Sequence, residues 1–288
     1  MNYFTPTEAA DAFRLAAMDK SRRSFPEFAV MALLGGAFIA LGGLLSVMVA
    51  GGMPGVAEAN PGLVKFVAGA MFPIGLIMVS VTGADLFTSD CAGLTFPLYR
   101  KELTAGRVAG LLAISYLFNF VGAQLIAGLL SAHVGILDSD PWRDYLHQLS
   151  EAKVNQDFLR VLIKGIGANW LVCLGMFMGY AAKDITGKSI GIWIPVMLFV
   201  TLGYEHSIAN MFFIPAAIYT GAEITWSSFL VQNLLPATLG NIVGGMGLVG
   251  LVYGWLYLKR RNVETSKHRN TETPKHRNIE TYKLKYTL

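Results

Sequence analysis

Long apolar runs separated by short polar stretches dominate the hydrophobic pattern of this 288-residue sequence. About 20 consecutive apolar residues are enough for a helix to cross a bilayer. The pattern therefore predicts an all-α membrane protein with six transmembrane helices. The expected spans cover residues 28–50, 63–82, 108–130, 158–182, 190–219 and 233–258.

Two of these spans, the second and the fifth, are interrupted by glycine and polar residues. The second meets a break at residues 83–90 and continues as an apolar piece at 91–99, and the fifth contains a break at 203–210. Glycine lowers helix propensity, and polar groups at membrane depth are tolerated mainly where they face protein or a water-filled path. We therefore interpret both breaks as the lining of a pathway.

His206, within the second of these breaks, is the one histidine of five that we expect near the membrane midplane. For an isolated buried histidine, a purely structural hydrogen bond is the more common role. Here the position in a broken transmembrane helix favours a role in transport. Imidazole exchanges protons near neutral pH, so His206 is a candidate to donate a proton or a hydrogen bond to a small anion.

The two breaks occupy corresponding positions in two halves of three spans each. An odd number of spans per half places the halves in opposite orientations across the membrane. The third and sixth spans also share a local pattern, Asn-Phe-Val-Gly-Ala at 119–123 and Asn-Ile-Val-Gly-Gly at 241–245. Interrupted spans at matching positions indicate an inverted three-plus-three repeat with a transport site near the midplane. Chance similarity between glycine-rich segments is the alternative.

Composition and charge agree with a membrane protein and predict its orientation. The chain is 53% hydrophobic and 15% charged, whereas soluble domains contain about 25% charged residues. Eighteen of the 23 Lys and Arg residues lie at the two termini and in the second-to-third and fourth-to-fifth loops. The positive-inside rule then places both termini in the cytoplasm. The net charge of +4 is dispersed and does not indicate nucleic-acid binding.

The two ends of the chain flank an expected channel domain at residues 28–258. Residues 1–27 are expected to hold an amphipathic cytoplasmic helix, which either lies on the membrane surface or is a solvated leader. The carboxyl-terminal segment, residues 259–288, contains Lys-His-Arg-Asn at 267–270 and again at 275–278. Such a polar segment cannot bury a core, so we expect a disordered basic cytoplasmic tail.

Four motifs give the sequence a resemblance to a known family. They are Gly-Ala-Asp-Leu-Phe-Thr-Ser at 83–89, Ala-Asn-Trp-Leu-Val-Cys-Leu at 168–174, Glu-His-Ser-Ile-Ala-Asn-Met-Phe at 205–212 and Gly-Asn-Ile-Val-Gly-Gly at 240–245. The sequence resembles the formate/nitrite transporter family, of the formate channel type, over about residues 7–261. The resemblance implies an aquaporin-like fold with six spans, a pore in each protomer and a homopentamer.

The resemblance also implies roles for individual residues. His206 is the central pore histidine, and the other pore or substrate residues are Thr88, Asn169, Asn210 and Glu205. The apolar constrictions are Phe72, Leu76, Phe199, Leu86 and Phe87. Lys153 and Lys164 attract anions at the outer mouth. Structural roles are the alternatives: Thr88 as a helix cap, Asn169 as an interhelical bond, and the constriction residues as core packing.

These residues together predict a channel for small monovalent anions in a prokaryotic cytoplasmic membrane, with formate as the first candidate. Lys153, with Lys164 or Arg160, would concentrate anions at the mouth. His206 would then protonate a weak-acid anion, and the neutral acid would cross the apolar constriction. Nitrite or hydrosulfide is the alternative substrate, and a neutral-solute channel is a further alternative.

A membrane enzyme is the competing class of function, and the sequence does not support it. No nucleophile–base set accompanies His206, and one membrane histidine cannot make a metal site. The two cysteines, Cys91 and Cys173, match no metal-ligand spacing. We therefore expect no enzymatic activity, no metal and no cofactor.

Overall fold

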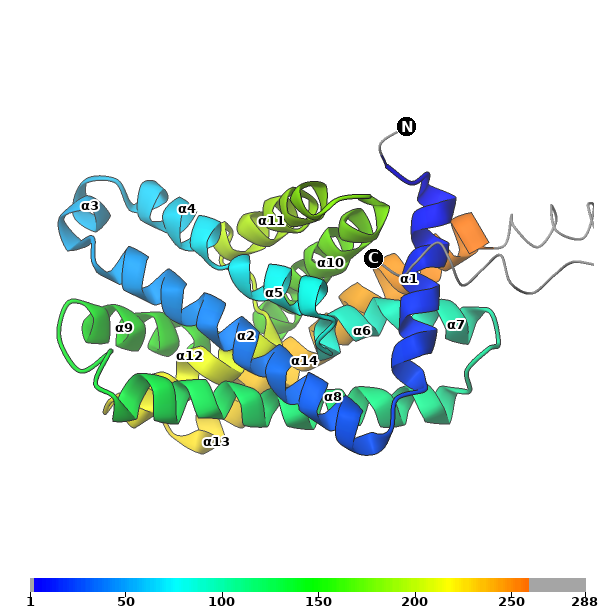
Figure 1. Ribbon diagram of the computed structural model, residues 1–288. Coiled ribbons are helices and arrows are strands. Elements are labelled where there is room, and N and C mark those ends of the chain that lie inside the picture. The colour runs from blue at the N-terminus through cyan, green and yellow to red at the C-terminus, as the bar shows by residue number, and fades with distance from the viewer. Residues whose placement is uncertain (1–2, 259–288) are drawn as a thin grey trace, which may run out of the picture.

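The computed structural model describes residues 3–258, and the chain there is built almost entirely from helices (Figure 1). The tail predicted for residues 259–288 lies outside the described residues. The helices in chain order are α1 Pro6–Ser21, α2 Phe25–Gly51, α3 Pro54–Ala59, α4 Pro61–Met71, α5 Ile74–Thr82, α6 Phe87–Gly93, α7 Thr95–Tyr99, α8 Ala105–Gln124, α9 Trp142–Val154, α10 Phe158–Ala181, α11 Ile185–Thr201, α12 Ser207–Tyr219, α13 Trp226–Ser228 and α14 Leu235–Ile242. Four π-helical segments extend them: η1 Leu125–His133, η2 Phe229–Leu234, η3 Val243–Leu251 and η4 Gly254–Leu258.

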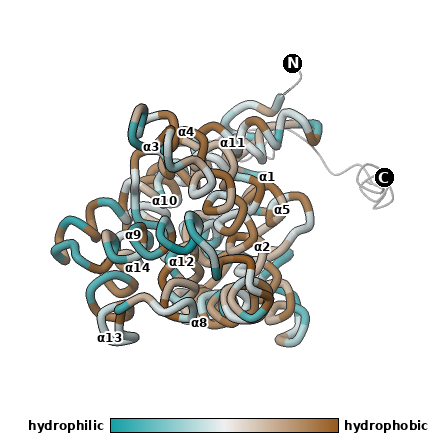
Figure 2. The backbone as a smooth tube through the Cα atoms, turned by 90° about the vertical axis from the view of Figure 1, so that its left-hand side faces the viewer, coloured by the Kyte–Doolittle hydropathy of each residue, from teal (hydrophilic) through white to brown (hydrophobic). Residues whose placement is uncertain are grey.

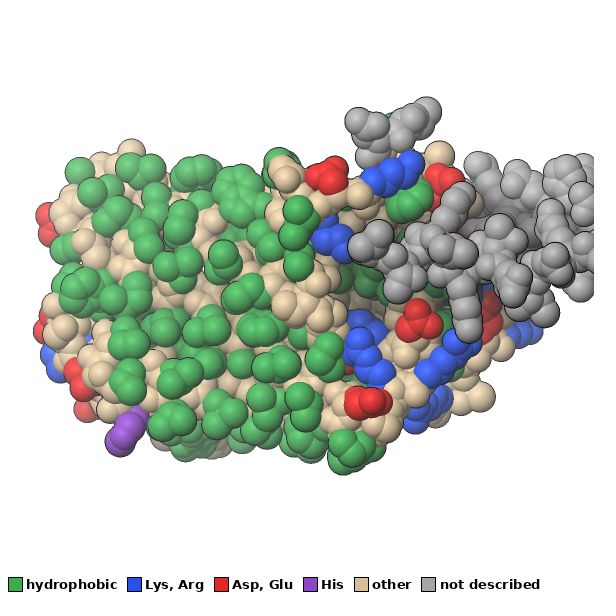
Figure 3. Space-filling view, in the orientation of Figure 1, with side chains coloured by type: hydrophobic (Ala, Val, Ile, Leu, Met, Phe, Trp, Pro, Cys, Tyr) green, Lys and Arg blue, Asp and Glu red, His purple; other side chains and the backbone are tan. Residues whose placement is uncertain are grey.

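The six expected spans are present. Five helical stretches are long and apolar enough to cross a membrane: Phe25–Gly51, Pro61–Thr82, Ala105–His133, Phe158–Ala181 and Trp226–Leu258. The remaining span consists of the shorter apolar helices α11 and α12, which the break separates. Figure 3 shows a continuous hydrophobic surface over the middle of one face, with Lys and Arg side chains gathered toward the end that carries α1 and α7. The molecule is therefore a multi-pass membrane protein.

Three boundaries differ from the sequence prediction. The connections expected at 53–61 and 132–156 contain the helices α3 and α9. In α9, Leu146, Ser150 and Val154 follow a four-residue spacing and are buried, so one face of this helix packs on the protein. The last span begins at Trp226 rather than at residue 233 because the Thr225 hydroxyl accepts the N–H of Ser228 at 3.0 Å and caps the helix. Figure 2 views the molecule from the end that carries α3 and α9, and it shows the hydrophilic colouring of α9.

Helix α1 lies across one end of the bundle (Figure 1). Thr5 and Glu8 form a capping box that starts the helix. Its small and aromatic residues Ala9, Phe13 and Ala17 are buried. The Phe13 ring stacks on Tyr180 of α10 with centroids 4.4 Å apart. The apolar face of α1 thus packs on the channel domain and not into solvent, and a position of this helix at the membrane surface stays a prediction.

The two breaks have the same backbone construction. Helix α5 ends at Gly83 (φ 76°), and α11 is followed by Gly203 (φ 70°). Both glycines adopt the left-handed conformation, which disfavours residues with a side chain. The chain resumes as helix at Phe87 and at Ser207, so the non-helical parts are shorter than the breaks expected from the sequence.

Candidate pore site

Asn241 holds the break between α11 and α12 from the sixth span. Its Oδ1 accepts the backbone N–H of Ser207 at 2.8 Å, and its Nδ2 donates to the carbonyl of Glu205 at 2.9 Å. The same Nδ2 donates to the carbonyl of Gly165 in α10 at 2.8 Å. A single buried amide therefore satisfies two backbone groups that the missing helix turn leaves without partners, and it ties them to a carbonyl inside α10.

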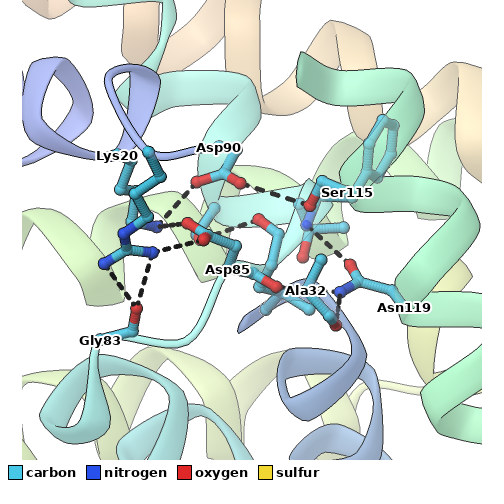
Figure 4. A network of polar contacts seen from close by, with 12 residues as sticks. Lys20, Ala32, Gly83, Asp85, Asp90, Ser115 and Asn119 are labelled. Atoms are coloured by element: carbon cyan, nitrogen blue, oxygen red, sulfur yellow. Dashed lines mark hydrogen bonds and ion pairs between the residues drawn. The ribbon is translucent and has the colours of Figure 1, made fainter. Parts of the chain in front are cut away.

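Asn119 holds the first break in the same way (Figure 4). Its Oδ1 accepts the backbone N–H of Phe87 at 2.8 Å, and its Nδ2 donates to the carbonyls of Asp85 at 2.9 Å and Ala32 at 2.6 Å. The partners of Asn119 occupy the same places in the first half as those of Asn241 in the second. The hydrogen bonds confirm the predicted inverted repeat.

His206 and Thr88 join the two breaks. The Nε2 atom of His206 lies 2.8 Å from Oγ1 of Thr88, at the first turn of α6. The Nδ1 atom of His206 accepts the backbone N–H of Ala209 at 3.1 Å and caps α12. An acceptor Nδ1 assigns the ring proton of a neutral imidazole to Nε2. His206 then donates to Thr88, and the Thr88 hydroxyl proton is available to a further acceptor.

A cavity of about 360 Å³ lies beside α9 and reaches His206, whereas Thr88 is not among its lining residues. His206, Phe72 and Phe199 are among its lining residues, together with Lys153 and Asn210. The Phe199 ring centroid lies 5.7 Å from that of His206 and 5.9 Å from that of Phe72. The structure thus brings five of the predicted residues to one cavity, with two aromatic rings beside the histidine.

Glu205 is the centre of a buried polar network next to this cavity. Its Oε2 accepts from Nζ of Lys153 at 3.0 Å and from Nδ2 of Asn210 at 2.7 Å. Gln156 donates to its Oε1 at 3.2 Å, and Asn233 donates to its Oε2 at 3.3 Å. The carboxylate therefore holds the broken helix and neutralises Lys153. The Oδ1 atom of Asn210 is buried without a hydrogen-bond partner.

The other basic residues near the cavity differ in their surroundings. Lys164 donates to the side-chain oxygen of Gln156 at 2.6 Å. Arg160 is exposed and lies 3.4 Å from the carboxylate of its neighbour Asp157. Lys65, at the start of the second span, lines the cavity, and the sequence analysis gave it no role. A lone charge in the first turn of an apolar run is the signal that would have identified it.

A family model described as Formate/nitrite transporter matches residues 7–255. The chain belongs to the formate/nitrite transporter family. The chain is 38% identical over 272 residues to a probable formate transporter of Methanothermobacter thermautotrophicus, with 90% of this chain and 98% of the relative covered. It is 37% identical over 262 residues to the formate channel BtFdhC of Bacillus thuringiensis, covering 91% of this chain and 99% of the relative.

Solved structures agree with this assignment. A structure titled "FNT family ion channel" superposes with a TM-score of 0.77 at 29% identity, covering 85% of this chain and 98% of that one. A pentameric formate channel with formate bound gives a TM-score of 0.71 at 28% identity, covering 81% and 98%. The predicted family and helical membrane fold are confirmed. Members of the formate/nitrite transporter family are channels or transporters, which confirms that the chain is not an enzyme.

The remaining predicted residues of this formate/nitrite transporter lie outside the cavity. Asn169 donates to the carbonyl of Asn241 at 2.7 Å, which is an interhelical bond. Leu76 and Leu86 are fully buried. Phe87 packs edge-on against Tyr116 of α8 with centroids 4.8 Å apart, and it lines a separate groove between α8 and α14. The constriction roles of Leu76, Leu86 and Phe87 stay predictions.

The two cysteines lie in the protein interior. Cys91 and Cys173 are both buried and free. The thiol of Cys173 donates to the carbonyl of Thr88 at 3.3 Å. Among residues 3–258, no group of three or more His, Cys, Asp and Glu side chains is arranged to hold a metal ion.

Lys20 of α1 forms a second charged cluster that the sequence analysis missed (Figure 4). Its Nζ lies 2.9 Å from Asp90 and 3.0 Å from Asp85, and Arg23 also pairs with Asp85. Burial alone would lower the pKa of Lys20, but the ion pairs with Asp90 and Asp85 outweigh burial and raise it. Lys20 lies 12 residues before Ala32, and Lys153 lies 12 residues before Gly165. The carbonyls of Ala32 and Gly165 are equivalent in the repeat, because they accept from Asn119 and Asn241. This shared spacing is the signal in the sequence that would have identified Lys20.

Proposed function

We propose that this chain is a channel for small monovalent anions, with formate as its principal substrate and a pore in each protomer. The observation that carries the proposal is the hydrogen bond of 2.8 Å between Thr88 and His206, which joins the two breaks beside a cavity that His206 lines. Formate channels among the relatives support formate as the substrate.

Entry begins at the cavity mouth on the α9 side. Lys65, Lys153 and Lys164 lie at or near this cavity, against one buried carboxylate, Glu205. An excess of positive charge in a concave site raises the local concentration of anions. Glu205 positions Lys153 and Asn210 and does not bind the anion, because like charges repel. Asn169 orients the sixth span from behind the site.

The constriction is an apolar barrier to hydrated ions. Phe72 and Phe199 line the cavity; in this proposal they form its inner end, with Leu76 and Leu86 beyond them. Removing a carboxylate-sized ion from water into an apolar interior costs several kcal/mol or more, of order 20 kcal/mol in the idealised limit. Apolar constrictions accordingly exclude ions while they pass neutral species.

His206 and Thr88 lower this barrier. The Thr88 hydroxyl donates a hydrogen bond to the anion while it accepts one from His206. At low pH the imidazole ring leaves its contact with the Ala209 N–H, takes up a proton at Nδ1 and transfers the Nε2 proton to formate. The acid then passes the constriction without charge and ionises again on the other side.

The assembly and the location of the protein are part of the same proposal. We propose a homopentamer in a prokaryotic cytoplasmic membrane, with residues 28–258 as the channel domain and both termini in the cytoplasm. The charged end around α1 and α7 supports this orientation. Helix α1 then covers the cytoplasmic end of the channel.

Anion uptake into liposomes tests the proposal. Purified protein is reconstituted, and uptake of formate, nitrite, hydrosulfide and glycerol is followed by stopped-flow across a pH series against protein-free liposomes. We expect fast formate uptake that rises as pH falls, with little glycerol uptake. Uptake of glycerol without any anion would support the neutral-solute channel and contradict the proposal.

A further inference from the structure

An apolar groove of about 410 Å³ lies between α8 and the last span, apart from the cavity that reaches His206. Thr238, Ile242 and Met246 line it from the last span, and Phe87 of α6 also lines it. The lining residues of α8 follow the spacing of one helix face: Ala105, Val108, Ala109, Leu112, Ala113 and Tyr116. The three alanines are exposed, so the groove opens at the surface of the transmembrane region.

The groove has the length of one leaflet of a bilayer. From Ala105 to Tyr116, α8 rises by about 16 Å, which is about half of a hydrocarbon core of about 30 Å. One end of the groove lies at Phe87, next in the chain to Thr88 at the meeting of the two breaks. The other end lies at Leu98 and Ala105, which flank the charged turn after α7.

The hydroxyl groups in the groove are already used. The Tyr116 hydroxyl lies 2.9 Å from Oγ1 of Thr238. The Thr238 hydroxyl donates to the carbonyl of Leu234 at 2.7 Å, so Tyr116 is the donor of the first bond. Neither hydroxyl proton is free for a polar ligand. An occupant of the groove is therefore apolar along its length, as a hydrocarbon chain is.

The charged end of the groove carries an excess of positive charge. Arg100 reaches the last span and donates to the carbonyl of Leu258 at 3.1 Å. Lys101 is exposed and forms no ion pair within the described part of the chain. Glu102 lies 4.0 Å from Arg100 but pairs more closely with Arg14, at 2.7 Å. Basic residues at the end of a membrane span attract anionic lipid headgroups.

We propose that this groove binds a phospholipid with an anionic headgroup. One acyl chain lies between α8 and the last span, and the headgroup lies against Arg100 and Lys101. A neighbouring protomer in a ring presents its own basic turn at the same depth in the membrane, so it does not supply the negative charge. The site goes beyond anion transport and does not depend on it.

Labelling by a photoreactive lipid locates the site. The full chain is reconstituted in phosphatidylcholine with a small, constant fraction of phosphatidylglycerol that carries a photoreactive group in one acyl chain. Labelled residues are identified by mass spectrometry after illumination, while unlabelled phosphatidylglycerol replaces phosphatidylcholine in steps. We expect label at Phe87, Tyr116 or Met246 that falls as unlabelled phosphatidylglycerol is added. Label at Leu117, which is exposed on α8 and does not line the groove, should stay constant.

Substitutions at the two ends of the site test its chemistry. Arg100→Gln combined with Lys101→Gln should lower the affinity for phosphatidylglycerol, read from the competition, by about tenfold or more, since each basic residue near the surface contributes about fivefold. Arg22→Gln removes a charge from an exposed side chain outside the groove and should have little effect. Ala109→Phe fills the groove and should abolish its label, whereas Leu117→Phe should not.

Three results would overturn the inference. One is label in the groove that unlabelled phosphatidylglycerol does not displace, and another is an unchanged affinity in the variant without Arg100 and Lys101. The third is an unlabelled groove with crosslinks between protomers at Ala109→Cys, which would assign the groove to a neighbouring subunit. The native labelling needs no variant, so it tests the inference even where Ala109→Phe fails to fold. Formate uptake does not enter these measurements, so their failure leaves the proposed function intact.

Discussion

Asn119 and Asn241 make the same three hydrogen bonds in opposite halves of the molecule. Each accepts one backbone N–H and donates to two carbonyls, at distances between 2.6 and 2.9 Å. The partners lie on both sides of a helix break and on a neighbouring span. One residue type thus fixes the position of each break, and with it the positions of Thr88 and His206.

We predict that Asn119→Ala and Asn241→Ala destabilise the protein to a similar extent. Each substitution leaves one N–H and one carbonyl of a break buried without the asparagine as partner, and each such group costs about 1–3 kcal/mol. A thermal unfolding assay in detergent should show a lower midpoint for both variants. The exposed Asn155 at the end of α9 is the matched control, and Asn155→Ala should unfold like the native protein. A near-native midpoint for Asn241→Ala would show that the break is held by other contacts.

Because Lys153 pairs with Glu205, we predict that Lys153→Met lowers the stability of the protein and that a second substitution, Glu205→Gln, restores it. Lys153→Met leaves the Glu205 carboxylate buried without its cation, which typically costs about 3–5 kcal/mol. Lys153→Met combined with Glu205→Gln removes both charges and should recover most of the lost unfolding midpoint. Formate uptake by the double variant should stay below native at low anion concentration, because the cavity has lost a cation. Recovery of neither property would argue against a charge-pair origin of the effect.

Lys65 should act on uptake through its charge alone. It lies at the cavity mouth and is exposed, so Lys65→Gln should lower the initial rate of formate uptake at low ionic strength. The difference from native should shrink in about 0.5 M inert salt, where the Debye length falls to a few ångströms. Lys65→Arg keeps the charge and serves as the control. An effect of Lys65→Gln that persists unchanged at high salt would mean that the side chain acts by another route.

Lys20 should anchor α1 to the channel domain. Its raised pKa means that the protonation of Lys20 contributes its full stabilisation below its ordinary value of 10.5, and that this contribution is lost as pH rises through the higher value in the folded protein. Lys20→Met should therefore expose α1 at neutral pH and speed chymotrypsin cleavage beside Phe13, whose side chain on this helix is buried in the native protein. Arg22→Met is the control, since the Arg22 side chain is 72% exposed. A native cleavage rate for Lys20→Met would show that the aromatic contacts of α1 hold this helix on the channel domain without the ion pairs.

The sequence predicted the spans and both breaks because hydrophobic length and polar interruptions are local signals. It also predicted the inverted repeat from the shared pattern at Asn119 and Asn241. It did not predict helix α9 or the packing of α1, because the partners of their buried faces are distant in the sequence. The contacts of Lys20 and Lys65 were missed for the same reason: each single lysine resembles a solvated loop charge until the helix opposite it is known. The motif at residues 83–89 predicts Phe87 at the constriction, and that role stays a prediction beside its contact with Tyr116.

The role of His206 is tested most directly by His206→Asn. Asparagine is a good helix N-cap and can accept the Ala209 N–H in place of Nδ1, but it has no group that titrates. Formate uptake into liposomes is measured for native protein, His206→Asn and His206→Phe between about pH 5 and pH 8, the range in which histidine changes charge. The account predicts a folded His206→Asn variant whose uptake no longer rises as pH falls beyond the protein-free background. A His206→Asn variant with the native rate and pH profile would contradict proton transfer by the central histidine.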